Sequence, residues 1–234
     1  MSGKGKVLSV QNIECETLGT LETMFKSDGY SVDKIRAWRD SIPISSRGYS
    51  TVVLLGGPMA VYDKLVSLSH EQELVRDCIK KDIPVLGICL GSQIIAQSIG
   101  GSVFRGEKKE IGWGDISITA ESRNALFSGL AKTLNVFHWH GDTYSLPIEA
   151  KVLARSENYI QAFRYKSAVG IQFHLEVNVE MIKQWNLRYS KELLAEGIDP
   201  ERNIRPELAE ELAKSCRKFY SNFSSMVKSS ANKG

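Results

Sequence analysis

The chain has 234 residues, 42% of them hydrophobic and 24% charged, which is ordinary for one well-filled α/β domain and argues against two. Thirty basic against 27 acidic residues leave a net charge of only +3, so a strongly basic nucleic-acid or membrane surface is not expected. No apolar run approaches the roughly 20 residues that cross a bilayer. The four cysteines form no C-x-x-C pair and the N-terminus shows no secretory pattern, so we expect a cytoplasmic protein with reduced thiols.

The first hundred residues alternate between strand and helix patterns. Continuous or alternating apolar runs predict strands over 6–10, 30–35, 51–55 and 85–88. Apolar residues at helical spacing predict helices over 18–25, 70–81 and 92–98. This β-α-β alternation predicts an α/β fold, with a mostly parallel central sheet and helices on both faces.

From residue 102 onward the pattern changes to short strands with turns, which predicts a small antiparallel excursion beside the main sheet. The strands expected there cover 102–105, 115–118, 133–137, 152–155 and 159–164, before a further strand over 168–173. Helices are expected over 181–189 and 206–227, the second with its apolar residues on one stripe. We therefore expect one domain over residues 1–190 and a C-terminal helical extension over 191–234 that packs on it.

Cys89 lies where the strand over 85–88 turns into a helix, between two glycines in the spacing G-x-C-x-G. Glycines two residues on either side permit the strained turn of a nucleophile elbow, which lifts the nucleophile clear of the sheet. A helix N-terminus at the thiol would lower its pKa from about 8.5. The alternative interpretation is a buried structural cysteine packed between two glycines.

The strand over 168–173 ends at His174, with Glu176 two residues further on. A cysteine nucleophile needs a base to take its proton, and the base needs a third group to hold its tautomer. A strand end that carries His-x-Glu supplies both groups from one rigid segment.

Four segments together resemble the class I (triad-type) glutamine amidotransferases over residues 5–190, and most closely the free-standing, GMP-synthase-like members and their γ-glutamyl peptidase relatives. These segments are L-G-G-P-M, G-I-C-L-G-S-Q, F-H-W-H-G-D-T and G-I-Q-F-H-L-E-V. The resemblance implies the flavodoxin-like fold of that family. It also implies that Cys89 is the nucleophile, His174 the acid and base, and Glu176 the group that orients His174.

In the same family the main-chain N–H groups that match Gly57 and Leu90 form the oxyanion hole. The resemblance further implies substrate contacts from Met59, Gln93, Trp139, His140, Gly141 and Asp142. The chain departs from the family pattern at Leu175, where most members have proline. Proline fixes φ and removes an N–H, so leucine loosens that corner without removing a catalytic atom.

His138 and His140 share one face of a predicted strand and could be metal ligands. No third ligand has supporting spacing, so we expect neither a metal nor a cofactor. His140 is then a structural hydrogen-bonding residue of the H-G-D segment.

The resemblance implies hydrolysis of the side-chain amide of L-glutamine to glutamate and ammonia through a γ-glutamyl thioester. A synthetase subunit, such as that of GMP synthase, would accept the ammonia. Two alternatives stay open: a hydrolase of γ-glutamyl peptides, and a non-catalytic binding subunit, against which the intact Cys-His-Glu set argues. No nucleic-acid or membrane partner is expected, and the chain is expected to be a monomer or a homodimer.

Overall fold

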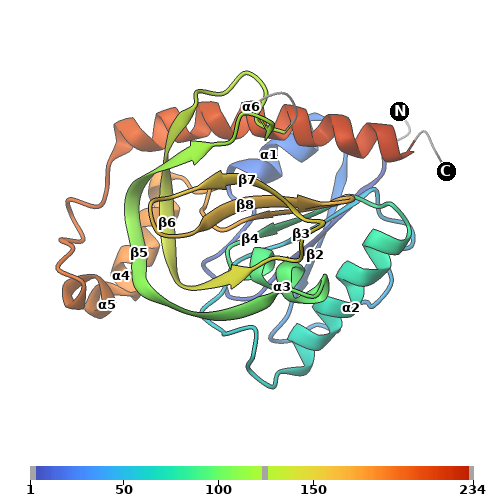
Figure 1. Ribbon diagram of the computed structural model, residues 1–234, viewed down its shortest axis with the longest axis horizontal. Coiled ribbons are helices and arrows are strands. Elements are labelled where there is room, and N and C mark those ends of the chain that lie inside the picture. Colours follow the sequence, from blue (N-terminus) through green and yellow to red (C-terminus); the bar gives the residue numbers. More distant parts are fainter. Residues whose placement is uncertain (1–3, 123–125, 232–234) are drawn as a thin grey trace.

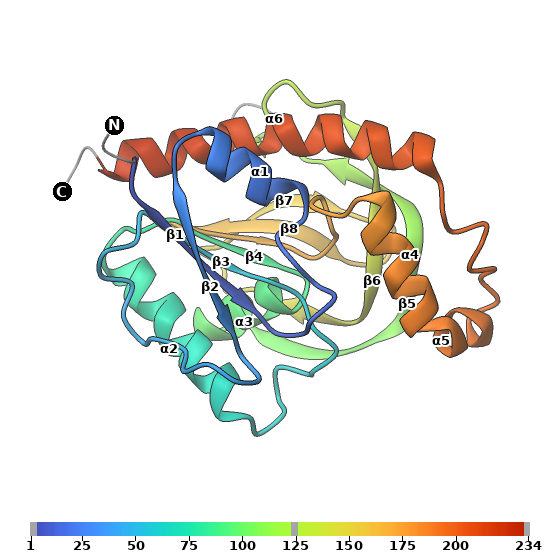
Figure 2. The ribbon, with the colours of Figure 1, turned by 180° about the vertical axis from the view of Figure 1, so that it is seen from behind.

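The computed structural model describes residues 4–122 and 126–231, so the outermost residues of the two expected units, 1–3 and 232–234, lie outside the described residues. The described part forms one nine-stranded sheet in the order β2-β1-β3-β4-β9-β8-β7-β5-β6, with helices on both faces (Figure 1, Figure 2). The five strands from β2 to β9 in this order run parallel. They are β1 (Lys6–Gln11), β2 (Ser31–Arg36), β3 (Thr51–Leu54), β4 (Val85–Ile88) and β9 (Ala168–Ile171).

The parallel half follows from its sequence because every residue of β3, β4 and β9 is buried. Strands covered on both faces consist of continuous apolar residues rather than alternating ones. α1 (Thr20–Ser27) connects β1 to β2 and α2 (Val66–Lys80) connects β3 to β4, whereas α3 (Leu90–Ser98) follows β4 and leads to the antiparallel half. α1 lies on one face of the sheet and α2 and α3 on the other, so the predicted fold class is confirmed (Figure 1).

The antiparallel half differs from the expected set of short strands. β5 (Ser102–Ile118) is one long strand that pairs with β6 (Thr133–Ser145), with an irregularity between Arg105 and Glu110. The charged and glycine-containing residues in the middle of β5 lack an alternating pattern. Those from Glu110 onward pair with β6, whereas residues 106–109 lie in the irregularity and have no register partner on β6. β7 (Lys151–Arg155) and β8 (Ile160–Tyr165) form the predicted hairpin, and β8 then pairs with β9.

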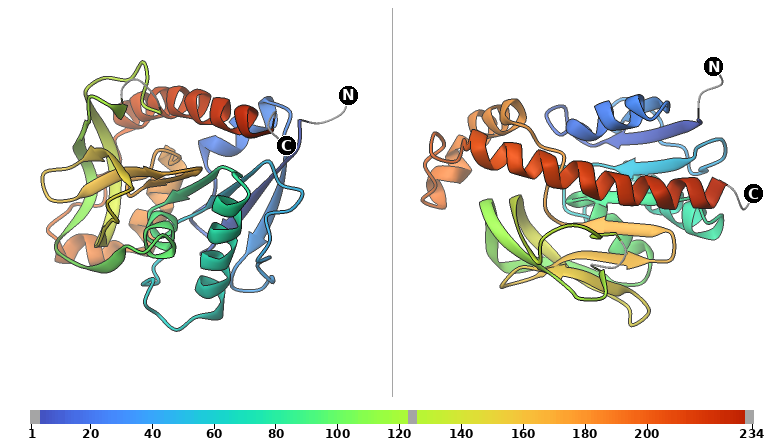
Figure 3. Two further views of the ribbon diagram at one scale, coloured as in Figure 1. Left: turned by 45° about the vertical axis from the view of Figure 1, so that its right-hand side comes forward. Right: turned by 90° about the horizontal axis from the view of Figure 1, so that it is seen from above.

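Three helices complete the chain: α4 (Val179–Arg188), α5 (Ser190–Ala195), which was not predicted, and α6 (Pro206–Ala231). α6 crosses the same face of the sheet as α1 (Figure 3). Its buried stripe joins the core, where Phe219 packs on Phe127 with ring centroids 5.4 Å apart and Tyr220 packs on Phe25 at 5.0 Å. No helix in the described ranges combines the length and apolarity needed to span a membrane.

One buried carboxyl group supports the end of β3. Asn12 donates hydrogen bonds to the Leu55 carbonyl at 3.2 Å and to Glu71 Oε2 at 3.4 Å. Glu71 lies on α2 and is fully buried. Burial raises its pKa to about 8, although the hydrogen bond from Asn12 lowers it. The Glu71 carboxyl group is therefore mostly protonated in the folded chain at neutral pH.

This raised pKa predicts that Glu71 lowers the stability of the fold as pH increases. Between the ordinary glutamate pKa of 4.5 and about 8, the unfolded chain releases the Glu71 proton while the folded chain retains it, so the free energy of unfolding falls with rising pH. At 1.36 kcal/mol per pKa unit, the loss between about pH 5 and about pH 7 is about 3 kcal/mol. Urea unfolding of the parent chain and of Glu71→Gln at both pH values measures this loss of unfolding free energy, which should be absent in Glu71→Gln.

Glu73→Gln, which changes an exposed glutamate on the same helix, is the matched control and should keep the parent's pH dependence. Equal pH dependence in the parent chain and Glu71→Gln would show that Glu71 is already ionised in the folded state.

Candidate active site

Cys89 lies at the turn between β4 and α3 with a left-handed backbone, at φ 51° and ψ −108°. Such a conformation is uncommon outside glycine and is found at strained functional turns. The main-chain N–H of Cys89 donates to the Ile171 carbonyl at 2.9 Å, which ties the turn to the end of β9. The backbone therefore has the geometry expected of a nucleophile elbow.

The two flanking glycines are required by close packing. A Cβ on Gly87 would lie 2.3 Å from the Gly91 carbonyl oxygen, and one on Gly91 would lie 2.2 Å from the Leu54 carbonyl oxygen. Main-chain atoms at those distances cannot move aside cheaply. The G-x-C-x-G spacing thus lets the first turn of α3 lie directly against β3 and β4.

His174 and Glu176 follow β9 at the same edge of the sheet. His174 Nδ1 lies 2.7 Å from Glu176 Oε1, and both side chains are almost fully buried. The main-chain N–H of His174 donates to the Phe137 carbonyl at 2.8 Å. The His174 ring packs edge-on against Trp185, with ring centroids 4.7 Å apart. Leu175, at the position of the family proline, is buried in the core, so apolar packing holds this corner.

The charges in this group depend on one another. Burial opposes protonation of His174, but the charge of Glu176 and a hydrogen bond with Cys89 outweigh it and raise the His174 pKa well above its usual value. Burial raises the pKa of the Cys89 thiol, while the hydrogen bond and charge of His174 lower it. The helix terminus was expected to lower the pKa of the Cys89 thiol. This prediction is wrong for the chain without substrate, because the effect of burial on the pKa is larger than the effects that lower it. The thiol also lies 3.6 Å from the Trp139 carbonyl, to which it donates its proton.

The residues expected at the oxyanion hole lie beside the thiol. Leu90 is the first residue of α3, and N–H groups in the first turn of a helix have no partner within the helix. Gly57 lies next to it, since a Cβ on Gly57 would be 3.2 Å from Leu90 Cδ2. Both residues line the same cavity as Cys89.

Every residue expected to contact the substrate lines this cavity, which has a volume of about 280 Å³. Those residues are Met59, Gln93, Trp139, His140, Gly141 and Asp142. The Gln93 amide also has a structural part, because it donates to the Asp142 carbonyl at 3.3 Å and to Gln172 Oε1 at 3.2 Å. The structure thus brings together segments that lie far apart in the sequence.

Glu16 is a residue of this site that the sequence reasoning missed. It is nearly buried, lines the cavity, and lies so close to Gly56 that a Cβ there would be 2.0 Å from Glu16 Oε2 and 3.2 Å from His174 Cε1. Burial raises the Glu16 pKa to about 7, while the charge of His174 lowers it. Its position after β1, at the carboxyl edge of the parallel strands, was the available signal.

A second missed group closes the cavity from the side of α5. Lys109 pairs with Glu192 at 2.7 Å and with Glu196 at 3.1 Å, and the Trp139 indole N–H donates to Glu192 at 3.1 Å. These contacts connect β5, β6 and α5 at the cavity wall. No sequence signal pointed to them, because α5 and the middle of β5 were not predicted.

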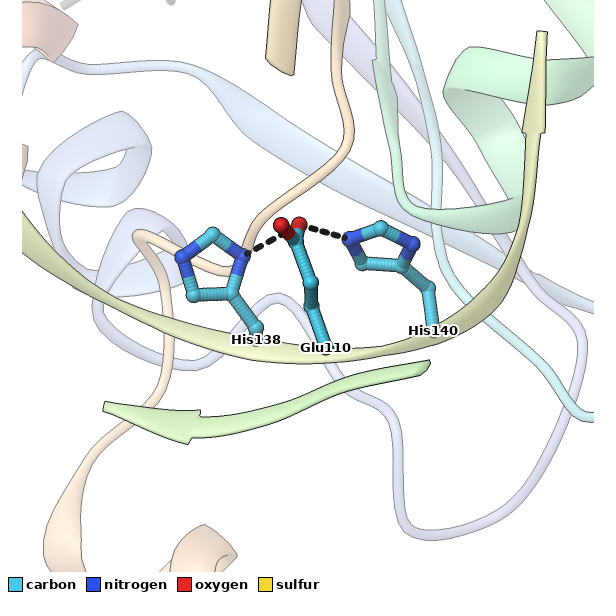
Figure 4. A group of neighbouring side chains, drawn as sticks. All are labelled: Glu110, His138 and His140. Carbon is cyan, nitrogen blue, oxygen red and sulfur yellow. Dashed lines mark hydrogen bonds and ion pairs between the residues drawn. The ribbon is translucent and has the colours of Figure 1, made fainter. Parts of the chain in front are cut away.

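His138 and His140 project toward a third residue, Glu110 of β5 (Figure 4). Glu110 Oε2 lies 3.0 Å from His140 Nε2 and 3.8 Å from His138 Nδ1. Burial opposes ionisation of Glu110, but hydrogen bonds from His140, Asn158 and Ser156 outweigh it and lower its pKa to about 2. Burial lowers the pKa of His138 to about 4. His140 thus has the hydrogen bonds expected of it, and Glu110 is the third neighbour that the sequence spacing did not indicate.

Comparison of the chain with known proteins identifies the family that it resembles. The family model described as glutamine amidotransferase class-I matches residues 16–188. The glutamine amidotransferase-like protein YfeJ of Salmonella typhimurium is 30% identical over 191 residues, 78% of this chain and 80% of YfeJ. One chain of the glutamine-hydrolysing GMP synthase of Pyrococcus abyssi is 37% identical over 138 residues, 57% of this chain and 70% of the Pyrococcus chain.

The crystal structure of a glutamine amidotransferase from Thermotoga maritima has a TM-score of 0.87 and 38% identity, and covers 95% of this chain and 98% of its own. The match thus includes the antiparallel half and the C-terminal helices as well as the parallel core. The family model alone spans well over half of the sequence, from Glu16 to the end of α4. The chain belongs to the class I glutamine amidotransferase family.

Proposed function

We propose that this chain hydrolyses the side-chain amide of L-glutamine to glutamate and ammonia, with Cys89 as the covalent nucleophile. The observation that carries the proposal is the buried group in which Cys89 interacts with His174 and His174 Nδ1 lies 2.7 Å from Glu176. The thiol lies at a strained turn on the floor of a cavity of about 280 Å³, where a small substrate can reach it.

In the first half of the reaction, Cys89 Sγ attacks the Cδ carbon of glutamine and His174 takes the thiol proton. The amide oxygen becomes an oxyanion, which the N–H groups of Gly57 and Leu90 stabilise. His174 then returns its proton to the amide nitrogen, and the C–N bond breaks to release ammonia. A γ-glutamyl thioester on Cys89 remains.

In the second half, water attacks the thioester and gives its proton to His174. The C–S bond breaks, glutamate leaves, and the thiol is restored with the proton from His174. Glu176 acts through His174: its carboxylate accepts a hydrogen bond from the Nδ1–H group, fixes the ring tautomer and stabilises the imidazolium. The raised pKa of His174 supports this role, because it reports the stabilisation of the charged ring by Glu176.

The ammonia would serve a synthetase. Several relatives are named as one chain of a GMP synthase made of separate chains, which supports a separate synthetase as the partner of this protein. Glu16 lines the same cavity as Cys89, and its carboxyl group, with a pKa of about 7, interacts electrostatically with His174.

Hydrolysis of γ-glutamyl peptides is the second candidate, because the acyl half of the reaction is the same. Arg105 favours it: this cation has an exposed side chain and lines the cavity together with Tyr62 and Trp139. A dipeptide has a second carboxylate beyond the scissile amide, which a guanidinium can bind through two parallel hydrogen bonds.

The nucleophile assignment predicts that a glutamine-like diazoketone will alkylate one residue, Cys89, with one equivalent per chain. Peptide mass spectrometry after labelling measures the site. Cys15→Ala is the matched control, because Cys15 is the one cysteine among the described residues that is not buried and its removal should leave labelling unchanged. Adducts at Cys15, Cys78 or Cys216 in place of Cys89 would overturn the assignment.

The triad assignment predicts a graded loss of kcat. Cys89→Ala and His174→Ala should abolish nearly all turnover, since removal of a general acid and base alone costs about 10²–10⁴-fold. Glu176→Gln should cost less, because His174 still reaches the thiol and the amide still bonds to the ring. Ammonia release under saturating glutamine measures the series. Turnover close to that of the parent chain in folded His174→Ala or Glu176→Gln would show that the substituted residue is only structural.

The substrate assignment predicts a higher kcat/KM for glutamine than for a γ-glutamyl dipeptide on the isolated chain. If Arg105 binds the second carboxylate, Arg105→Gln should raise the KM for the dipeptide by about tenfold, equivalent to the roughly 1.4 kcal/mol lower limit of a charged hydrogen bond. Arg105→Lys keeps the charge and is the control. Vigorous turnover of the dipeptide with little of glutamine would assign the chain as a peptidase.

A further inference from the structure

The pairing of β5 with β6 gathers Glu110, His138 and His140 on one face of the hairpin. Glu110 is the cross-strand partner of His140, and Gly112 is the partner of His138. Because side chains alternate along a strand, Glu110 projects to the same side as both histidines (Figure 4). One ligand-type atom from each residue lies within 4.8 Å of the other two.

The outer hydrogen bond of each histidine determines which nitrogen faces Glu110 without a proton. His140 Nδ1 lies 3.1 Å from the Asp142 carbonyl, which can only accept, so this nitrogen carries a proton. Nε2 therefore faces Glu110 as an N–H donor when the ring is charged and with its lone pair when the ring is neutral. His138 hydrogen-bonds the Gly114 main chain on its Nε2 side. Its buried Nδ1 has no hydrogen-bond partner among the described residues and lies toward Glu110.

With both rings neutral, two imidazole lone pairs and a carboxylate oxygen converge on one point. The carboxylate is held in place by three outer donors: Ser156 Oγ at 2.7 Å and Asn158 Nδ2 at 3.0 Å on Oε1, and Gln161 Nε2 at 2.6 Å on Oε2. Electron-pair donors that converge in this way need a cation between them. Histidines that donate their outer N–H to a main-chain carbonyl, beside a carboxylate fixed by its own hydrogen bonds, are the usual surroundings of a bound metal ion.

We propose that Glu110, His138 and His140 bind one divalent transition-metal ion, with zinc as the preferred ion. Two imidazoles and one carboxylate form a ligand set that zinc accepts. In a tetrahedral site with bonds of about 2.0–2.1 Å, the ligand atoms are about 3.3 Å apart. The separations of 3.0 Å and 3.8 Å from Glu110 Oε2 lie on either side of this value. All three ligand atoms lie within 4.8 Å of one another, so a side-chain movement of about 1.5 Å or less brings each pair to the tetrahedral separation.

The ion would be structural. The side chains of His138 and His140 are almost fully buried, so the point between them is closed to a substrate. His140 belongs to the same stretch of β6 as Trp139 and Asp142, whose carbonyls contact Cys89 and Gln93. A metal ion that joins β5 to β6 here would fix this wall of the cavity without taking part in the reaction.

The test uses Cys89→Ala as the parent, because zinc would also bind the Cys89 and His174 pair. Calorimetric titration of the chelator-treated protein with zinc should give one equivalent. Cobalt at the same site should give visible d–d bands without the near-ultraviolet band of a cobalt–thiolate bond. Glu110→Gln and His138→Gln in this parent should each lower zinc affinity by about a hundredfold or more. His70→Gln, which changes a histidine of α2 outside the cluster, should leave the affinity unchanged.

Each other outcome contradicts the proposal. Absence of zinc or cobalt uptake by folded Cys89→Ala shows that a proton, not a metal, is the shared cation. A thiolate band, or unchanged affinity in Glu110→Gln and His138→Gln, places the ion elsewhere. If either ligand variant fails to fold, the stoichiometry and cobalt spectrum of the parent still decide. Since the parent has no nucleophile, these results do not depend on whether glutamine is the substrate.

Discussion

The hydrogen bond from the Cys89 N–H to the Ile171 carbonyl, 2.9 Å long, links the two halves of the site. It continues the parallel ladder of β4 and β9, in which Ile88 is the register partner of Ile171. Because both strands end at the same edge, the turn after one and the segment after the other must meet there. The interaction of Cys89 with His174 is therefore a consequence of strand register and does not depend on a flexible loop.

Three glutamate side chains lie near this edge of the sheet. Glu176 contacts His174 directly, Glu16 lies against Gly56, and Glu71 lies behind Asn12. Burial raises the pKa of Glu16 and of Glu71. Of the three, only Glu176 has a cationic partner within hydrogen-bonding distance among the described residues. The fold thus maintains one carboxylate beside the imidazole and keeps Glu71 mostly neutral, which limits the negative charge that an oxyanion would meet.

The parallel half and the proposed triad could be predicted because their signals are local. Continuous apolar runs marked the buried strands, and G-x-C-x-G marked the turn whose glycines have no room for a Cβ. The middle of β5 could not be predicted, because only pairing with β6 makes its charged and glycine residues a strand. Glu110 was missed for the same reason: its relation to His138 and His140 is a cross-strand register. Glu16 was missed because its burial depends on Gly56 and His174, far away in the sequence.

The position of α6 has a consequence for how the protein is made. The helix packs on α1, and Thr20 contacts Cys216 across 196 residues, so α1 is covered by a helix that is synthesised much later. Until α6 is synthesised, the apolar side of α1 around Phe25 lacks Tyr220, its edge-to-face partner. Contacts of such long sequence separation close late and slow folding. The nascent chain therefore keeps this apolar face uncovered, and open to chaperones, until the 196 residues from Thr20 to Cys216 have been translated.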